Sequence, residues 1–422
     1  LKQKSNDQIQ MSLGWGQMGA LLQLGLKLNN FSIANLLKKN KDHKGFLPIG
    51  DGETMSLNAQ TNGKYYQSYG LQYATNWFGG KRPIQFTLGA NFSKSTDLNS
   101  SYYNRSYMEN YYNYMYGVGN YNYNNYENYL DPDKYIQIWG FYAGWGKRLR
   151  WPDDYFQLSL QLSYQRYILK NWRYFFVMSN GTANNLSLNI TLNRSSTDNQ
   201  LYPRTGSEFS ASLSITPPWS KFDKKDYKHL ANDRFSATYQ EEQQEKYRWV
   251  EYHKWKFKAR TFTALNNGNK CFVLMTRIEF GLLGSYNKYK KSPFETFYMG
   301  GDGMSGYSSN YAQETIGLRG YENGQLTQHG EGYAYERMTL ELRYPFLLGN
   351  TTIYGLGFVE AGNAWTETSK FNPFDVKRSA GIGVRIFLPM VGMMGIDWAY
   401  GFDKVFGKRG GSQFHFILGQ EF

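Results

Sequence analysis

The sequence predicts an all-β protein: a transmembrane antiparallel β-barrel of about 16 strands with long extracellular loops. Three observations predict this fold. Apolar and polar residues alternate along many segments, the segments are about ten residues long or longer, and short connections between them alternate with long ones. The composition agrees with this fold. Of the 422 residues, 18% are aromatic, only 19% are charged, and 44 residues are glycine. No run of about 18 apolar residues occurs, so no transmembrane helix is expected.

The alternation is clearest in residues 155–165 and 271–283. In the first segment, glutamine and serine face one way and a row of apolar residues faces the other, namely Phe156, Leu158, Leu160, Leu162 and Tyr164. In the second, Arg277 and Glu279 face away from Phe272, Leu274, Ile278, Phe280 and Leu282. Strands of a soluble sandwich also alternate, but they usually span about 5–6 residues. A tilted strand that crosses a bilayer needs about 9–11.

The connections fix the number of strands. Short turns are expected at 151–154, 265–269 and 388–392, and long loops at 97–134, 218–247 and 287–331. The strands between them are predicted at 9–17, 19–29, 52–62, 65–77, 83–96, 135–149, 154–169, 183–194, 206–217, 248–263, 269–285, 333–345, 351–362, 376–388, 391–402 and 411–422. Because backbone amides must be paired in lipid, we expect this sheet to close or nearly close, and residues 1–422 to form one barrel domain.

The charge distribution and the motifs argue against nucleic-acid binding, metal binding and catalysis. The formal net charge is +13, but the basic residues are scattered through loops such as 221–229 and 287–291, which favours anionic lipid headgroups over nucleic acid. Cys271 is the single cysteine, so neither an intrachain disulfide nor a cysteine metal site is possible. The five histidines have no ligand spacing, and the glycine-rich residues 300–306 lack the Lys-Ser/Thr of a phosphate loop. We expect no catalytic residues, no metal and no cofactor.

One loop motif stands out. The long connection 287–331 contains Leu318-Arg319-Gly320-Tyr321, and Gly300 and Gly301 stand near its start. Glu341 in TLELRYP and Glu360 in FVEAGNAW follow on the next two predicted strands, and the chain ends on an aromatic strand, SQFHFILGQEF. This succession resembles the BamA family of outer-membrane insertases, most clearly over residues 295–422. The resemblance implies that loop 287–331 folds into the barrel lumen and that Leu318, Arg319, Gly320 and Tyr321 anchor it there.

Charge chemistry gives the anchor a physical basis. The planar guanidinium of Arg319 carries donors that match carboxylates, and Glu341 and Glu360 take the lumen-facing parity of neighbouring strands. Phe358 shares the face of Glu360, which weakens the parity argument for that strand. Gly320 permits a tight turn of the backbone. The prediction is therefore an ion pair between the loop and the barrel wall.

The resemblance also implies a working seam between the first and last strands. Unpaired strand edges are templates for an incoming strand, and glycine weakens strand pairing. The seam residues expected on this basis are Met11, Gly14, Gly16, Phe414, Phe416, Gly419 and Phe422.

The function implied is that of the central barrel of an outer-membrane protein assembly machine in a Gram-negative bacterium. Its partners would be unfolded outer-membrane protein substrates, accessory assembly lipoproteins and outer-membrane lipids, but not nucleic acid. A related barrel that secretes or assembles specific clients is an alternative, as is a passive pore or a barrel lipase. The family's insertases carry periplasmic POTRA domains before the barrel. Because strands begin near residue 9, we expect none within this chain.

Overall fold

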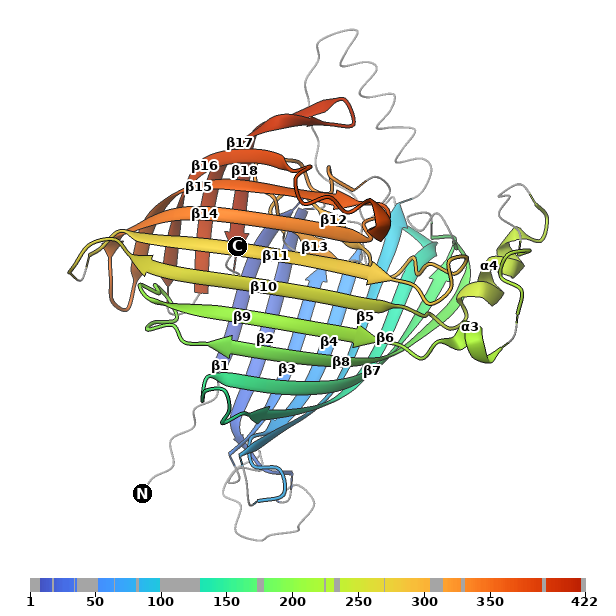
Figure 1. Ribbon diagram of the computed structural model, residues 1–422. Helices are drawn as coiled ribbons and strands as arrows, with labels where there is room; N and C mark the ends of the chain where they lie inside the picture. Colours follow the sequence, from blue (N-terminus) through green and yellow to red (C-terminus); the bar gives the residue numbers. More distant parts are fainter. Residues whose placement is uncertain are drawn as a thin grey trace.

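The structure is a computed structural model that describes residues 8–16, 19–33, 35, 52–63, 65–80, 83–98, 130–172, 178–223, 225–230, 236–268, 270–303, 314–327, 331–388 and 392–418. Sixteen strands form one sheet in which each strand pairs with its neighbours in the chain, always antiparallel (Figure 1). The predicted fold class is confirmed.

The strands in the first half of the sheet are β1 (Gln8–Gly16), β2 (Gly19–Phe31), β3 (Glu53–Asn62), β4 (Tyr66–Thr75), β5 (Ile84–Leu98), β6 (Leu130–Arg148), β7 (Phe156–Lys170) and β8 (Gly181–Ser195). Those in the second half are β9 (Gly206–Ile215), β10 (His253–Ala264), β11 (Val273–Gly284), β14 (Ala334–Leu347), β15 (Thr352–Trp365), β16 (Lys377–Leu388), β17 (Gly392–Val405) and β18 (Lys408–Leu418). Each corresponds to one predicted strand, with ends displaced by a few residues.

The long connections contain short elements that the sequence did not predict. In the described parts of these connections, two helices lie between β9 and β10, α3 (Trp219–Phe222) and α4 (Tyr239–Tyr247), and two short strands between β11 and β14, β12 (Phe297–Met299) and β13 (Glu314–Ile316). A 3-10 turn, η3 (Thr368–Lys370), follows β15. Strands of three residues are too short to show alternation, and α4 reads YQEEQQEKY, which has no apolar stripe to reveal a helix.

Two predicted boundaries are wrong by about five residues. Strand β10 begins at His253 rather than 248, because the chain before it turns aside to bond β8: Asn184 N donates to Arg248 O at 2.9 Å, and Val250 N to Asn184 O at 2.8 Å. Strand β6 begins at Leu130, so the tyrosine-rich loop is shorter than 97–134. Residues 99–129 of that loop lie outside the described residues.

The two faces of the sheet have opposite chemistry. Along β14, Leu340 and Leu342 are exposed, whereas Thr339, Glu341 and Arg343, which alternate with them, are buried. Apolar side chains are likewise exposed on the outer face of other strands, namely Phe141, Leu162, Leu188, Ile278, Val359, Ile382, Ile396, Phe414 and Phe416. An apolar exterior around a polar interior is the arrangement of a membrane barrel. Among the described residues, no helix is both long and apolar enough to span a membrane.

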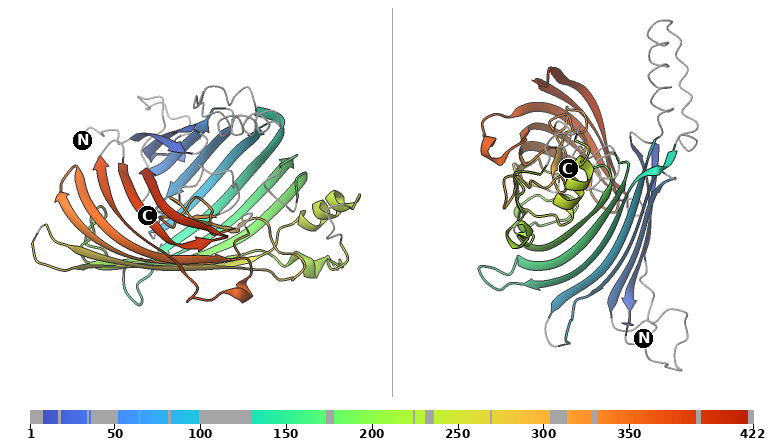
Figure 2. Two further views of the ribbon diagram at one scale, coloured as in Figure 1. Left: turned by 90° about the horizontal axis from the view of Figure 1, so that it is seen from above. Right: turned by 90° about the vertical axis from the view of Figure 1, so that its right-hand side faces the viewer.

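The sheet curves strongly but its ladder does not join end to end. Seen from above, the strands bend around a central lumen (Figure 2). The hydrogen-bonded order runs from β1 to β18, and over the described stretches no ladder joins those two strands. Each of them therefore presents one unpaired edge.

The connection between β11 and β14 packs against the inner wall. Phe297, Leu318 and Tyr321 from this connection belong to one buried cluster with Tyr167 of β7 and Tyr335 of β14. Within the described residues of 287–331, the loop thus fills part of the lumen.

Candidate functional site: a loop anchored inside the barrel

Backbone hydrogen bonds hold the two halves of the loop together. Strands β12 and β13 pair in parallel, from Phe297 opposite Glu314 to Met299 opposite Ile316. Gly301 and Leu318 continue the contact as a bridge, each N–H donating to the other's carbonyl at 3.2 and 3.1 Å. The side chain of Leu318 is fully buried in the hydrophobic cluster of the lumen, and Arg319 follows it directly.

Gly300 and Gly301 are required where they stand. Their φ angles are 129° and 75°, in the region that favours glycine. A Cβ on Gly300 would lie 2.4 Å from the carbonyl oxygen of Glu322, so the returning loop backbone leaves no space for a side chain.

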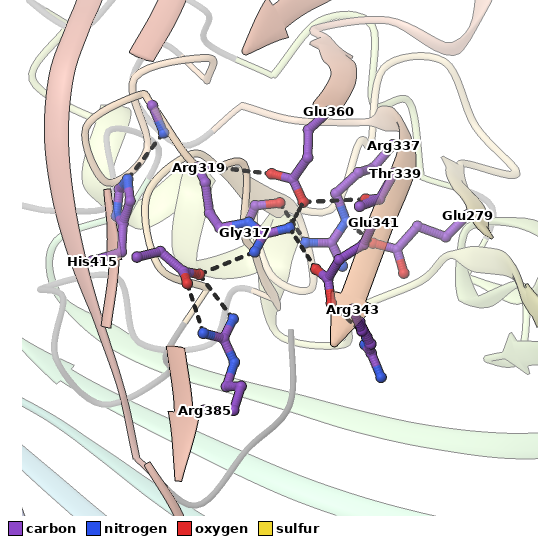
Figure 3. A network of polar contacts seen from close by, with 12 residues as sticks. Glu279, Gly317, Arg319, Arg337, Thr339, Glu341, Arg343, Glu360, Arg385 and His415 are labelled. Atoms are coloured by element: carbon purple, nitrogen blue, oxygen red, sulfur yellow. Dashed lines mark hydrogen bonds and ion pairs between the residues drawn. The ribbon is translucent and has the colours of Figure 1, made fainter. Parts of the chain in front are cut away.

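Arg319 is fully buried and contacts three carboxylates on three different strands (Figure 3). Its Nη2 lies 2.7 Å from Oε1 of Glu360 on β15 and 3.2 Å from Oε2 of Glu341 on β14. Its Nη1 lies 3.0 Å from Oδ2 of Asp397 on β17. The backbone N–H of Arg319 also donates to Glu360 Oε2, at 2.9 Å. The loop motif and both glutamates singled out in the sequence therefore meet in one place.

Two further arginines balance the carboxylates. Arg385 of β16 donates through Nη1 and Nη2 to Asp397 at 2.6 and 2.8 Å, and Arg343 of β14 donates through Nε to Glu341 at 2.6 Å. The side chain of Thr339 donates to Glu360 Oε1 at 3.1 Å. We call Arg319, Glu341, Glu360, Asp397, Arg343 and Arg385 the anchor network. Three cations alternate with three anions, which compensates for their removal from water.

Phe358 has a part in this network. Its ring lies on the lumenal face of β15, two residues before Glu360, and its centroid is 3.4 Å from the guanidinium carbon of Arg319. The face of a π-system attracts a cation. Phe358 and Glu360 therefore both face the lumen, and the ring of Phe358 supports the guanidinium of Arg319.

Electrostatics hold Arg319 charged. Burial alone would lower the pKa of Arg319, but the adjacent carboxylates of Glu360, Glu341 and Asp397 raise it above its ordinary value. The guanidinium therefore stays protonated at any pH at which the barrel is folded.

Gly320 is set tightly against the last two strands. Its φ is 88°, and an added Cβ would lie 2.8 Å from the backbone nitrogen of Gly401. Conversely, a Cβ on Gly401 of β17 or on Gly410 of β18 would each lie 2.3 Å from the carbonyl oxygen of Gly320. Three glycines thus allow backbone to contact backbone. His415 of β18 fixes the position, because its Nε2 accepts a hydrogen bond from Gly320 N at 2.9 Å.

Tyr321 completes the motif. It is fully buried, and its hydroxyl donates to the carbonyl oxygen of Arg378 at 2.7 Å. Burial raises the pKa of Tyr321 to about 12, so the hydroxyl remains a donor. On the other side of Arg319, the carbonyl of Gly317 accepts from Arg337 Nη1 at 2.6 Å. The motif therefore contacts β14, β15, β16, β17 and β18.

A family model described as the Omp85 superfamily domain matches residues 49–422. The chain belongs to the Omp85 superfamily. No curated protein sequence matches it significantly.

Two solved structures show the same fold as this Omp85 barrel. One is BamA from Haemophilus ducreyi lacking POTRA domains 1–3, with a TM-score of 0.61 and 16% identity, covering 98% of this chain and 70% of that one. The other is CdiB from Escherichia coli, with a TM-score of 0.53 and 10% identity, covering 98% of this chain and 67% of that one. At these identities the likeness concerns the fold alone.

The predicted seam of the Omp85 barrel is only partly described. Met11, Gly14 and Gly16 lie on β1, which pairs with β2, and Phe414 and Phe416 are exposed on the outer face of β18. Gly419 and Phe422 lie outside the described residues. Strand β18 connects the anchored loop with the seam. His415 lies between Phe414 and Phe416 on this strand and faces inward, where it contacts Gly320.

Several residues of the anchor network and of the backbone contact at Gly320 were not predicted from the sequence. Asp397 lies between Ile396 and Trp398, and Arg385 between Val384 and Ile386. A single charge flanked by apolar residues on a strand signals a lumenal position, and that signal was present in both. Gly401 and Gly410 carried no usable signal, because only the contact with Gly320 distinguishes them from other strand glycines.

In the described residues, no group of three or more His, Cys, Asp and Glu side chains is arranged to hold a metal.

Proposed function

We propose that this chain folds and inserts β-barrel proteins into the bacterial outer membrane, using the seam between β1 and β18. The single observation that carries the proposal is the pair of unjoined strands at the ends of the sheet, one of which is held from inside by the anchored loop. An unpaired edge offers free N–H and C=O groups to an incoming strand. The proposal assigns no catalytic residue and no cofactor to the chain.

The anchor network would keep the last strands in place while the seam works. Arg319 binds carboxylates of β14, β15 and β17, and Gly320 packs against β17 and β18. A client strand could pair with β1 without displacing a strand of the sheet, because none of the fifteen strand pairings in the described sheet uses the outer edge of β18 or of β1. The proposed partners are unfolded outer-membrane proteins, accessory assembly lipoproteins and the surrounding lipids.

The likeness to CdiB favours a second function, because it shows that the same barrel fold occurs in a protein other than BamA. On this alternative, the chain would export or assemble a specific client. A passive pore is the third, but among the described residues the lumen holds the buried cluster of Phe297, Leu318 and Tyr321, which narrows any open channel.

Depletion of the protein in its own cells tests the proposal. Loss of many outer-membrane barrel proteins from the membrane fraction is expected for a general insertase. Loss of one exported protein alone would support the secretion alternative, and unchanged levels of all barrel proteins would contradict both. Complementation with Arg319→Ala and with Arg150→Ala, an exposed arginine of the β6–β7 turn, separates the loop anchor from nonspecific loss of charge.

A further inference from the structure

Arg277 is a buried cation without a hydrogen-bond partner. It lies on the lumenal face of β11 and is 1% exposed. Across the described part of the chain, none of its three side-chain nitrogens has a hydrogen-bond partner. A buried charge in this condition is costly unless a counter-charge is supplied.

The cations around Arg277 have their own carboxylates. Arg260 lies directly opposite on β10, and its Nε donates to Glu208 at 2.7 Å. Arg337 lies on the other neighbouring strand, β14, and its Nε is 2.5 Å from Oε1 of Glu279. Neither carboxylate is therefore available to neutralise Arg277 fully.

Lys258 is the second under-compensated cation. It faces the lumen from β10 opposite Glu279, and its Nζ lies 4.0 Å from Glu279 Oε2, whose other oxygen serves Arg337. Lys256, two residues away on the same strand, has Glu314 Oε1 at 2.8 Å. The local excess of positive charge therefore rests on Lys258 and Arg277, which we call the cation pair.

A cavity has Lys258 of the cation pair in its wall. It has a volume of about 280 Å³ and lies between β10, β11, β14 and the loop, with Lys258, Glu279 and Arg337 in its wall. Arg277 is the next lumen-facing residue before Glu279 on β11 and does not itself line the cavity. The cavity is large enough for a small organic acid or one acidic side chain.

We propose that the cation pair binds a carboxylate group that enters from this cavity. A guanidinium presents a planar fork of donors that fits a carboxylate. A dianion such as phosphate is disfavoured, because Glu279, Asp302 and Glu314 balance the three cations of the cavity wall, Lys256, Lys258 and Arg337, and leave no further positive charge in the wall for a second negative one. The carboxylate comes from a free organic acid or from an Asp or Glu side chain of a polypeptide in the lumen. The inference does not depend on the proposed insertase function.

Thermal unfolding of the purified barrel in detergent tests the site. The midpoint is measured against sodium acetate and against sodium chloride at equal ionic strength, and then against a short blocked peptide with one glutamate and its glutamine counterpart. Binding to the folded state alone raises the midpoint saturably. Acetate is expected to do so and chloride is not. A larger effect of the glutamate peptide than of acetate would identify a polypeptide source, and equal or smaller effects a free acid.

Variants decide whether the cation pair is responsible. Arg277→Met and Lys258→Met are each expected to weaken acetate binding at least tenfold, and Arg150→Met, on the exposed β6–β7 turn, is expected to leave it unchanged. Without acetate, Arg277→Met is expected to unfold at the same or a higher temperature, because an unpaired buried charge is removed. If Arg277→Met does not fold, the test is the line broadening of ¹³C-labelled acetate, measured with the wild type and with Lys258→Met. Equal effects of acetate and chloride, or an acetate effect that persists in both variants, would overturn the proposal.

Discussion

The guanidinium of Arg319 lies over the ring of Phe358 on the inner wall of the barrel, with the guanidinium carbon 3.4 Å from the ring centroid. The first residue comes from a loop and the second from β15, so the contact joins the lumenal loop to the wall. Around the edge of the same guanidinium, Glu360, Glu341 and Asp397 accept its hydrogen bonds. The face of the guanidinium and both of its terminal nitrogens thus have partners, which explains how a fully buried arginine is tolerated.

Removal of Arg319 is expected to release the loop. In Arg319→Ala, three carboxylates lose their shared cation, and breaking a buried pair on one side costs about 3–5 kcal/mol. We expect faster cleavage of residues 287–331 by protease and a lower unfolding midpoint on heating. Arg150→Ala is the matched control. Unchanged protease protection of the loop in Arg319→Ala would show that the contacts do not anchor it.

Phe358→Leu tests the stacking contact separately from the ion pairs. A desolvated cation–π contact is worth about 2 kcal/mol, and the leucine keeps most of the apolar volume. The unfolding midpoint should fall by less than in Arg319→Ala. Phe280→Leu on β11 changes the same residue type on the outer face, where 37% of the residue is exposed, and should have little effect. Equal losses from the two leucine variants would assign the effect to apolar area instead.

Gly320→Ala distinguishes close backbone contact from backbone strain. Gly320 and Gly407 have φ angles of 88° and 85°, but a Cβ on Gly407 meets nothing within 4 Å, whereas one on Gly320 meets the backbone of Gly401 at 2.8 Å. Both alanines incur strain of about 1–3 kcal/mol, and only Gly320→Ala also displaces the loop from β17 and β18. We expect increased protease cleavage of the loop in Gly320→Ala alone. Similar cleavage in both variants would contradict the close packing.

A second set of loop contacts should be sensitive to acid. Burial alone would raise the pKa of Glu314 on β13, but Lys254 and Lys256, with Nζ atoms at 2.7 and 2.8 Å, lower it to about 2 from an ordinary value of 4.5. Because the folded pKa is the lower one, the stabilisation is complete above about pH 4.5 and is lost as the pH falls towards 2.

Pepsin, which is active across this range, measures the loss. Cleavage of the loop in the wild type should rise between pH 4 and pH 2. Glu314→Gln should be cleaved faster than the wild type at pH 4 and should lose part of the pH dependence, while other carboxylates titrate as before. Identical pH profiles for the two proteins would exclude Glu314 as a source of the effect.

The sequence predicted the barrel and the centre of the site but not the completed network. Period-two alternation is strong in strands with an apolar exterior, so every strand of the sheet was located, and Glu341 and Glu360 were assigned correctly to the lumen. Strands β12 and β13 and helix α4 lacked a periodic pattern. Asp397 and Arg385 are distant from the motif in the chain, and only the curvature of the sheet brings β16 and β17 to Arg319. The closure expected of the sheet is not seen in the described ladder, because β1 and β18 each pair on one side only.

The most direct test of the account places a photoreactive residue at Met11 in β1 and, as a control, at Leu57 in β3, which pairs with strands on both sides. Crosslinking is performed in cells that synthesise a barrel client. The account predicts client crosslinks from residue 11 and none from residue 57, with the yield at residue 11 reduced in Arg319→Ala. Equal crosslinking from both positions, or no client crosslink from residue 11, would contradict it.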